Sequence, residues 1–584
     1  MPVGYPTNAF FYKGEWYNTD GEGVPATVVT HPITGGSVFV GPNSTLELPP
    51  GANTLSGSGV AAGEAYPEQY GAVGDGVADD GAAVQAAINA AGTLRLKTGS
   101  TYKIKNVKIP SNRHLDLSGG TLIFGGVHGS APLSESVPVL LYVEGTVGDR
   151  VRNVKISGGR LVGSRTGTDY QYISANPEQD HLSFQYADMV VIDGVEFLDS
   201  KQDFISLDSV TGVVITGNKF DRAVDVAVDI RVGDGIYVAG NSAIMVRSLV
   251  SCKPNAANVI VSGNYAQTFG KGITAHGPGW RIVDNTIDAV TSPDGQIGAN
   301  TSGIDVFETG GAQVGVNFSG ILISRNQISG RSNDSGVYLR TNANSTGSNL
   351  VVSDNIINAA RGVLIEAGAG IEVRGNRMTT TIAAIVINGG TGLSVRGNTA
   401  TASAGLAISA ATPGIAIEGN DFTAATDVAI AITSGATGAR VVGNRCSGTI
   451  GIRSYGAGVK IDGNTVTSTA GAAIESRGAG SSVSGNVLAA TGGEAVLIGA
   501  TKTLVSQNLG SSGTHGVRAG PSGSGALANG SVISSNVFTG MQFFGANITS
   551  GATGVMVLGN SLTGNTSGGL TDAGTGTVTA NNAV

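Results

Sequence analysis

Val and Ile recur along this chain at a spacing that predicts stacked coils of β-strand. From VVITGN to VMVLGN a short phrase repeats, consisting of a β-branched residue, any residue, a small or polar residue, and Asn. Eleven of the fourteen intervals between successive Asn residues span 20 to 24 residues. Repeats of this length are typical of solenoids, in which each repeat packs only on its neighbours. The fifteen positions are Asn218, Asn241, Asn264, Asn285, Asn326, Asn355, Asn376, Asn398, Asn420, Asn444, Asn464, Asn486, Asn508, Asn536 and Asn560.

The residue three before each Asn is Val or Ile in all fifteen cases, from Ile215 to Val557, so we expect this position in one continuous core. Val and Ile favour a pleated strand, and the L-x-x-L-x-L core of leucine-rich repeats is missing. Asn tolerates the left-handed backbone that a sharp turn needs, and stacked Asn side chains can bond from coil to coil. We therefore predict an all-β, right-handed, single-stranded parallel β-helix with coils of about 22 residues and a structural Asn ladder.

The segment from Tyr70 to Ala91 reads YGAVGDGVADDGAAVQAAINAA and predicts a short helix at the start of the solenoid. Asp79 or Asp80 can cap this helix, and its apolar face includes Val84 and Ile88. Because an exposed strand edge invites aggregation, a helix that covers the open first coil has a structural purpose.

Through this opening motif and the coil repeat, residues 66 to 584 resemble the pectate-lyase-like superfamily of β-helix proteins. Members of that superfamily often open with YGAxGDGxxDDT and a short helix, and here Gly81 stands where Thr is usual. The superfamily includes pectate and alginate lyases, polygalacturonases, uronan epimerases and many bacteriophage tailspikes that bind or cut surface polysaccharide. The resemblance implies the fold and a polysaccharide partner, and it leaves the reaction open.

The first sixty residues lack the coil repeat and contain an aromatic cluster followed by short β-like runs such as SVFVG. We predict an anchoring or capping module at residues 1–60, the opening motif with its capping helix at 61–100, and the parallel β-helix at 101–584. A module before the opening motif, on a chain that starts without a secretory signal, is similar to the virion-anchoring end of a phage tailspike. That likeness implies a virion or baseplate partner, a homotrimer and a place in the phage tail. The alternative is a secreted or cell-surface protein.

Composition and charge exclude several classes of function. Gly accounts for 92 of 584 residues and charged residues for 13%, which suits turns and small side chains. No apolar stretch approaches the ~18 residues of a membrane span. A net charge of -8 without a Lys/Arg cluster argues against nucleic acid as a partner. The two cysteines have no metal-ligand spacing and no calcium-binding repeat appears, so we expect neither a metal nor a cofactor.

Charged residues are concentrated in one part of the chain. Residues 391–584 contain 15 of the 76 charged side chains, whereas residues 160–310 contain 18 of the 42 carboxylates. The carboxylate-rich part also contains or adjoins the two longest departures from the coil period, and long insertions on a solenoid commonly wall a binding face. We therefore expect the site there and expect the distal half to be structural.

Alternation within four successive coils predicts two columns of side chains that face solvent. Ile205 and Leu207 in the first coil, like Ile273 and Ala275 in the fourth, should face inward. Their neighbours should then face outward. One outward column contains Asp208, Arg231, Lys253 and His276, and the column beside it contains Ser206, Asp229, Ser251 and Thr274.

The outward columns allow three interpretations. Side chains in adjacent coils lie near ~5 Å apart, and those across one coil near ~10 Å, which spans the carboxylate separations of glycosidases. Asp208 and Asp229 are therefore candidates for the acid and the nucleophile or base. Elimination from a uronic acid would instead need a base and cationic groups, roles suited to Lys253 or His276 with Arg231. The third interpretation is an exposed ion-pair ladder that keeps the solenoid soluble.

Other polar and aromatic residues extend the candidate face and are predicted to bind substrate. The candidates are Tyr170 and Tyr172 in the first insertion, followed by Asp305, Phe307, Tyr338, Arg340 and Glu366. The leading hypothesis is a phage tailspike that binds and depolymerises a host surface polysaccharide. A non-catalytic virion fibre or adhesin and a bacterial uronan lyase or epimerase are the two alternatives.

Overall fold

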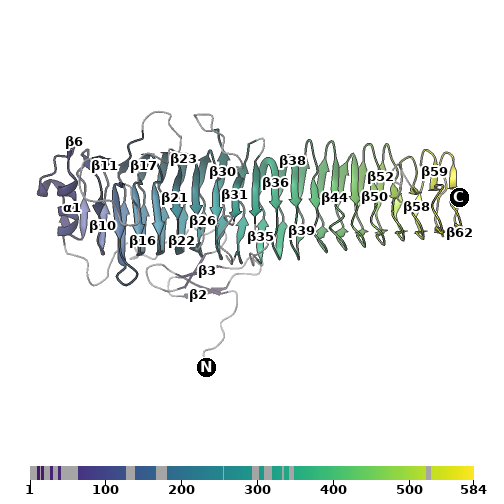
Figure 1. The fold of residues 1–584 in the computed structure, drawn as a ribbon, viewed down its shortest axis with the longest axis horizontal. Coiled ribbons are helices and arrows are strands. Elements are labelled where there is room, and N and C mark those ends of the chain that lie inside the picture. The colour runs from purple at the N-terminus through teal and green to yellow at the C-terminus, as the bar shows by residue number, and fades with distance from the viewer. Residues whose placement is uncertain are drawn as a thin grey trace, which may run out of the picture. The chain divides into compact units, whose positions relative to one another are not determined.

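The described residues from 63 onward form a parallel β-solenoid of about 19 turns and contain almost no helix, as the Asn repeat predicts (Figure 1). It divides into two compact units, one of residues 1–269 with 291–297 and one of residues 270–290 with 298–584. We refer to them as unit 1 and unit 2. The computed structural model describes residues 63–125, 138–165, 180–253, 256–291, 302–307, 318–331, 334–340, 348–520 and 528–584, and four strands before residue 63.

A typical coil of unit 1 contains three strands. They are β19 (Val210–Thr216), β20 (Lys219–Ala223) and β21 (Val226–Ile230). Each pairs in parallel with the equivalent strand of the next coil, namely β22 (Gly233–Ala239), β23 (Ser242–Val246) and β24 (Ser248–Cys252). We call these the first, second and third strands of a coil. In Figure 1 the first strands β10 (Arg113–Asp116), β16 (Ala187–Asp193) and β22 lie along one edge of unit 1.

The Asn side chains form a hydrogen-bonded ladder at the turn between the first and second strands. In unit 1 the Asn218 backbone N–H and Nδ2 both donate to Asn241 Oδ1, at 2.9 and 3.0 Å. Nδ2 also donates to the Ile192 carbonyl at 3.0 Å. Asn241 repeats the pattern with Asn264. The prediction that Val or Ile three residues before each Asn is buried is confirmed, because these side chains are at most 1% exposed.

The left-handed backbone at this turn belongs to the residue before each Asn. Gly217 has a φ of +63°, and all fifteen equivalent residues have positive φ. Five of them are not glycine: Asp284, Arg325, Asp354, Gln507 and Ser535. The expectation that Asn itself adopts the left-handed backbone is therefore wrong. Asn is selected instead because its amide can donate and accept along the ladder.

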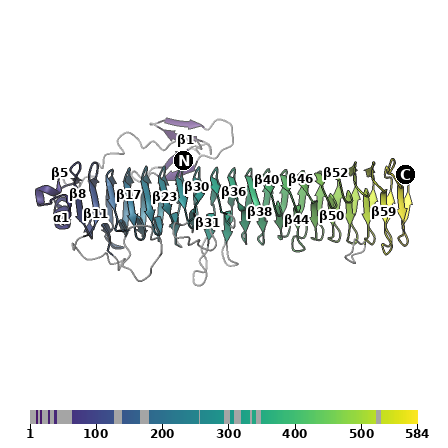
Figure 2. The ribbon, with the colours of Figure 1, turned by 90° about the horizontal axis from the view of Figure 1, so that it is seen from above.

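The predicted capping helix is present as α1 (Gly81–Ala90), with Val84 and Ile88 buried. Figure 2 shows it at the purple end of unit 1, beside β8 (Thr101–Ile104). The Asp80 carboxylate accepts hydrogen bonds from the backbone N–H groups of residues 73 and 74, and Asp79 accepts one from Gly81. Parallel pairing of the solenoid strands begins with β5 (Glu64–Ala65) on β7 (Thr93–Arg95). Because α1 lies between these two strands in the sequence, it belongs to the first coil.

Four strands before residue 63 form two antiparallel hairpins without the coil repeat. β1 (Ala9–Tyr12) pairs with β2 (Glu15–Asn18), and β3 (Thr27–Thr30) pairs with β4 (Ser37–Val40). This pairing differs from the parallel pairing of the solenoid strands.

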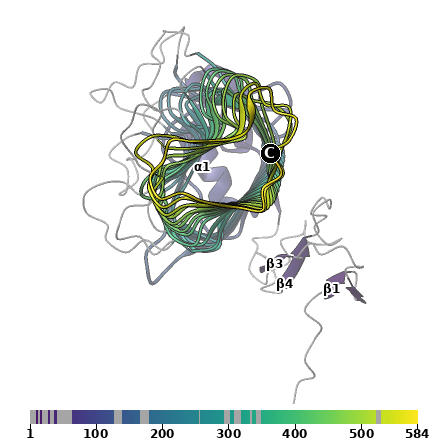
Figure 3. The same ribbon diagram turned by 90° about the vertical axis from the view of Figure 1, so that its right-hand side faces the viewer.

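Unit 2 repeats the same coil and extends the ladder beyond the sequence prediction. Its ladder runs from Asn285 to Asn560, and Asn560 then donates to Asn582 Oδ1 at 2.9 Å from Nδ2. Figure 3 shows the outlines of the green and yellow coils superposed in projection. A constant outline means that residues one coil apart occupy equivalent places, so side chains on one strand form columns.

Candidate functional site

The third strands of unit 1 hold the predicted columns in the expected register. β18 (Ile205–Asp208) pairs with β21, and β21 pairs with β24, so Ser206, Asp229 and Ser251 are neighbours. Ile205, Leu207 and the other residues predicted to face inward are buried. Ser206 and Thr274, which were predicted to face solvent, are buried as well, so burial does not follow the predicted alternation.

Asp229 is the centre of a charged cluster. Its side chain is 4% exposed, and Oδ2 lies 3.4 Å from Arg231 Nε and 3.5 Å from Lys253 Nζ. The expectation that Asp229 faces open solvent is wrong, because the two cationic side chains of its own and the next coil lie against it. Arg231 and Lys253 remain 23% and 59% exposed. The structure thus brings together three of the predicted residues.

Asp208 lies at the edge of this cluster. It is half-buried, and its Oδ1 accepts a hydrogen bond from Ser209 Oγ at 3.0 Å. It pairs in register with Gln185 of the preceding coil.

Two further carboxylates of the cluster, Asp203 and Asp225, are absent from the sequence prediction. Burial, followed by the charges of Asp229 and Asp180, raises the pKa of Asp203 well above its ordinary value. Burial also raises the pKa of Asp225, although Arg247 opposes this effect. The coil period could have predicted Asp203 and Asp225, because Asp180, Asp203 and Asp225 follow one another at intervals of 23 and 22 residues.

The carboxylates of unit 1 differ in their access to solvent and in their partners. Asp203 is 3% exposed, and its Oδ1 accepts the Val226 backbone N–H at 3.0 Å, which is a structural contact. The Asp225 side chain is 21% exposed. Asp225 Oδ1 also lies 3.4 Å from Arg247 NH1, whereas Asp229 lies against Arg231 and Lys253. Two carboxyl groups in different surroundings suit general acid and base roles.

A second cluster lies in unit 2, around Asp305 of β31 (Ser302–Phe307). Asp305 is 0% exposed, and its Oδ2 lies 2.7 Å from both Lys271 Nζ and Arg340 NH2. Tyr338 is its neighbour in register on β34 (Ser335–Arg340). The sequence prediction missed Lys271, which precedes β28 (Ile273–Ala275).

Tyr338 contacts both Arg340 and Glu366. The Arg340 guanidinium lies 4.4 Å from the centroid of the Tyr338 ring, and Tyr338 Oη donates to Glu366 Oε1 at 2.8 Å. Burial and this hydrogen bond raise the pKa of Tyr338 to about 12. Four of the residues predicted to bind substrate are thus brought together, but the expectation that Asp305 faces outward is wrong, because its carboxylate is buried against Lys271 and Arg340.

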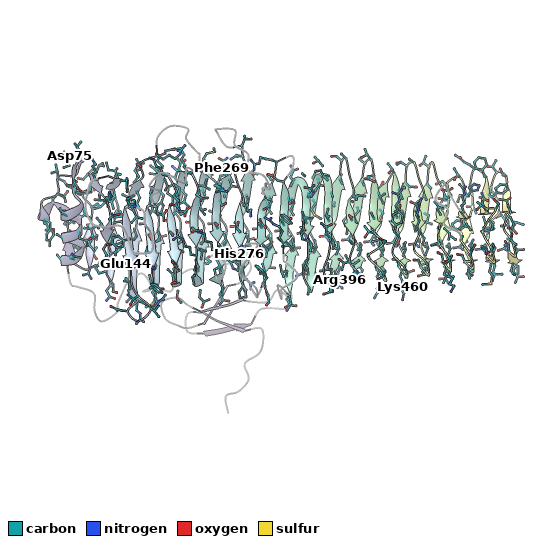
Figure 4. The ribbon with its side chains drawn as sticks, viewed as in Figure 1. Asp75, Glu144, Phe269, His276, Arg396 and Lys460 are labelled. Carbon is teal, nitrogen blue, oxygen red and sulfur yellow. The ribbon has the colours of Figure 1, made fainter. Side chains whose placement is uncertain are left out.

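His276 is buried, at 1% exposure, so the prediction that it faces solvent is wrong (Figure 4). Its carbonyl accepts a hydrogen bond from Trp280 Nε1 at 3.1 Å, and its ring lies 6.1 Å from that of Phe318. Burial lowers the pKa of His276 to about 4, and the nearby Asp305 only partly offsets this. His276 is therefore a neutral, packed side chain near neutral pH.

Three of the predicted side chains belong to parts of the chain that are not described. Tyr170 and Tyr172 lie outside the described residues, as does the side chain of Phe307. Within the described parts of the chain there is no group of three or more His, Cys, Asp or Glu residues that could hold a metal ion. The same parts contain no helix long and apolar enough to cross a membrane.

Comparisons with known proteins agree with the fold. Residues 271–446 match the family model described as right handed beta helix region. PfbA, a surface adhesin of Streptococcus pneumoniae, is similar in structure with a TM-score of 0.52 and 15% identity, over 60% of this chain and 92% of that protein. No curated protein sequence matches the chain.

Two other solved structures are similar at lower scores. A tailspike protein of E. coli bacteriophage HK620, solved with a pentasaccharide, has a TM-score of 0.38 and 14% identity over 77% of this chain and 76% of its own. A family 28 exopolygalacturonase of Yersinia enterocolitica has a TM-score of 0.40 and 14% identity over 56% and 75%.

The chain is a right-handed parallel β-helix protein. The fold that the resemblance to the pectate-lyase-like superfamily predicts is thereby confirmed.

Proposed function

We propose that this chain binds an extended surface polysaccharide along the third strands of unit 1 and hydrolyses it there. The observation that carries the proposal is the position of Asp229 between Arg231 and Lys253, with the partly exposed Asp225 near enough for the charge of Asp229 to raise its pKa. In this proposal Asp225 donates a proton to the glycosidic oxygen, and Asp229 acts as the nucleophile or as the base that activates water.

The burial of His276 removes one of the two candidate bases for elimination, and Lys253 remains the other. Elimination needs a base that reaches the sugar ring, and a histidine with 1% exposure cannot reach it without a rearrangement of the coil. In unit 1 the Asp225 side chain is 21% exposed, whereas Asp229 is 4% exposed and is reached only if Arg231 or Lys253 moves away from it. Arg231 and Lys253, which remain partly exposed, can also bind polar groups of the glycan.

The wider biological role is part of the same proposal. The chain would serve as a phage tailspike, a homotrimer attached to the virion or baseplate through residues 1–60. The two hairpins before residue 63, which differ in pairing from the solenoid, support a separate role for this segment.

The test is incubation of the purified protein with host-derived polysaccharides. We expect new reducing ends, and we expect Asp225→Asn and Asp229→Asn to lower turnover by at least ~100-fold, the usual scale for a positioned acid or base. The matched control is Asp193→Asn, at an exposed carboxylate on the first strand β16. Products with ultraviolet absorbance would instead indicate a lyase, and binding without products would indicate a fibre or adhesin.

A further inference from the structure

Charged side chains reappear on the third strands of unit 2 after a long uncharged interval. The column that contains Asp305 and Tyr338 continues through uncharged residues to β47 (Ile450–Ser454) and β50 (Ile474–Ser476). In register these are Leu364, Val386, Ser409 and Ala431, followed by Arg453 and Glu475.

Glu475 is buried between two arginines. It is 3% exposed, and Oε2 accepts a hydrogen bond from Arg453 Nε at 2.5 Å while Oε1 accepts one from Arg477 Nε at 2.7 Å. The arginine side chains remain 31% and 23% exposed. The carboxylate therefore orients both guanidinium groups at the surface, because each of its oxygens holds one of them.

An exposed aromatic ring completes the group. Tyr455 directly follows β47 and is 44% exposed. The Arg477 guanidinium lies 5.6 Å from the centroid of its ring. We call Arg453, Tyr455, Glu475 and Arg477 the distal patch.

Stability alone does not account for the distal patch. Removal of a carboxylate from water costs free energy that ion pairs only partly repay. The next coil has Leu497 at the register position of Glu475, with 5% exposure, so the column accepts an apolar residue there. A buried, ion-paired carboxylate at this position therefore costs more folding free energy than the apolar alternative. A use for the oriented guanidinium groups would explain why the charged residue is present.

The first strands of unit 2 show what a solvated ion-pair ladder looks like on the same coils. Glu418 lies 3.5 Å from Arg396 and 3.8 Å from Arg440, and the three side chains are 30%, 53% and 60% exposed. Figure 4 shows Arg396 and Lys460 on the same edge of the coils, and both are exposed. Such exposed ion pairs contribute little to stability, and their charged groups stay in contact with water. The distal patch differs because its carboxylate is buried and its cations are fixed.

We infer that the distal patch is a second glycan-binding site, which binds a sugar unit that carries a carboxylate. Two arginines and one glutamate leave a net charge of +1, which favours an anionic sugar. The outer guanidinium donors can bind its carboxylate, and the flat ring of Tyr455 can stack on the apolar face of the pyranose. The inference deepens the proposed function and rests on it for the class of ligand.

The experiment uses the full chain with Asp229→Asn, so that binding is measured without cleavage. Probes are defined oligosaccharides that contain galacturonate, glucuronate or mannuronate, each with its methyl-esterified, uncharged counterpart. We expect binding of at least one acidic probe by calorimetry, and at least ~10-fold weaker binding by Tyr455→Ala and by Arg477→Ala. Arg477→Lys keeps the charge but loses the paired N–H donors of the planar guanidinium, so it should also weaken binding. This variant tests the inference if Arg477→Ala fails to fold. The control Arg396→Ala should bind like the parent.

Three results of the binding measurements would overturn the inference. They are the absence of binding to every acidic probe, equal binding of acidic and esterified probes, and binding that the patch variants leave unchanged. A change of oligomeric state in Tyr455→Ala, measured by sedimentation, would make the patch a contact between copies and would overturn it too. Cleavage is assayed separately with Asp229 intact, so failure of the proposed hydrolysis and failure of distal binding are distinguishable.

Discussion

Replacement of Asn398 by Val should destabilise unit 2 strongly, although the side chain takes no part in either site. Asn398 is 1% exposed, and its Nδ2 donates to the Val373 carbonyl at 2.9 Å. Its Oδ1 accepts the backbone N–H of Asn376 at 3.0 Å. Val cannot replace either bond, so one buried carbonyl and one buried N–H lose their partners.

The expected magnitude follows from these two groups. A buried polar group left without a partner costs roughly 1–3 kcal/mol, so the free energy of unfolding should fall by about 2–6 kcal/mol. Urea denaturation measures this loss. Because coils of a repeat protein can open locally, amide hydrogen exchange at Asn376 is the sharper measurement, and its protection should fall.

Asn388→Val is the matched control for this prediction. Asn388 is exposed and lies in the coil before Asn398, so the same chemical change there should alter stability by no more than about 0.5 kcal/mol. Equal unfolding midpoints for the two variants, with unchanged exchange at Asn376, would refute the assignment of the ladder as a main source of stability.

Three further predictions concern other parts of the chain. Because the pKa of Asp203 is raised, the folded chain binds a proton at this carboxylate more tightly than the unfolded chain does. The contribution of Asp203 to stability is therefore greatest below its pKa in the unfolded chain. It is lost as the pH rises through its pKa in the folded chain. Thermal melts across this range should therefore show a smaller loss for Asp203→Asn than for the parent, and an identical pH dependence would contradict the assignment. The pH dependence expected from His276 has the opposite direction, because its pKa falls from 6.5 to about 4 on folding. Its contribution to stability is present above pH 6.5 and is lost as the pH falls towards 4. His276→Leu should therefore make the protein less sensitive to acid in the same thermal melts. Deletion of residues 1–60 should leave a folded solenoid by circular dichroism with unchanged cleavage, while incorporation into a larger particle is abolished; loss of the fold would place this segment in the core.

The fold was predictable from the sequence because its determinants are local and repeated. A Val or Ile three residues before each Asn must be buried in every coil, and the intervals between the Asn residues set the coil length. The capping helix was predictable for the same reason, since Val84 and Ile88 lie on one face of a short segment.

The turn itself was decided by geometry that no single residue type reveals. The sequence pattern pointed to Asn as the left-handed residue, yet the structure places positive φ on the preceding residue, even where that residue is Arg325 or Gln507. The reason is that the Asn amide must face the next coil to donate and accept at once.

The candidate site was only partly predictable, for a physical reason. Strand alternation separates inward from outward side chains, and it correctly brought Asp229 together with Arg231 and Lys253. It could not tell which outward side chains are covered, because burial depends on neighbouring coils and their long side chains. Asp229 and His276 are therefore buried against expectation. The sequence alone determined the coil and its columns, whereas the tertiary structure decided which charges leave water, and with them the raised pKa of Asp225 that the proposed acid requires.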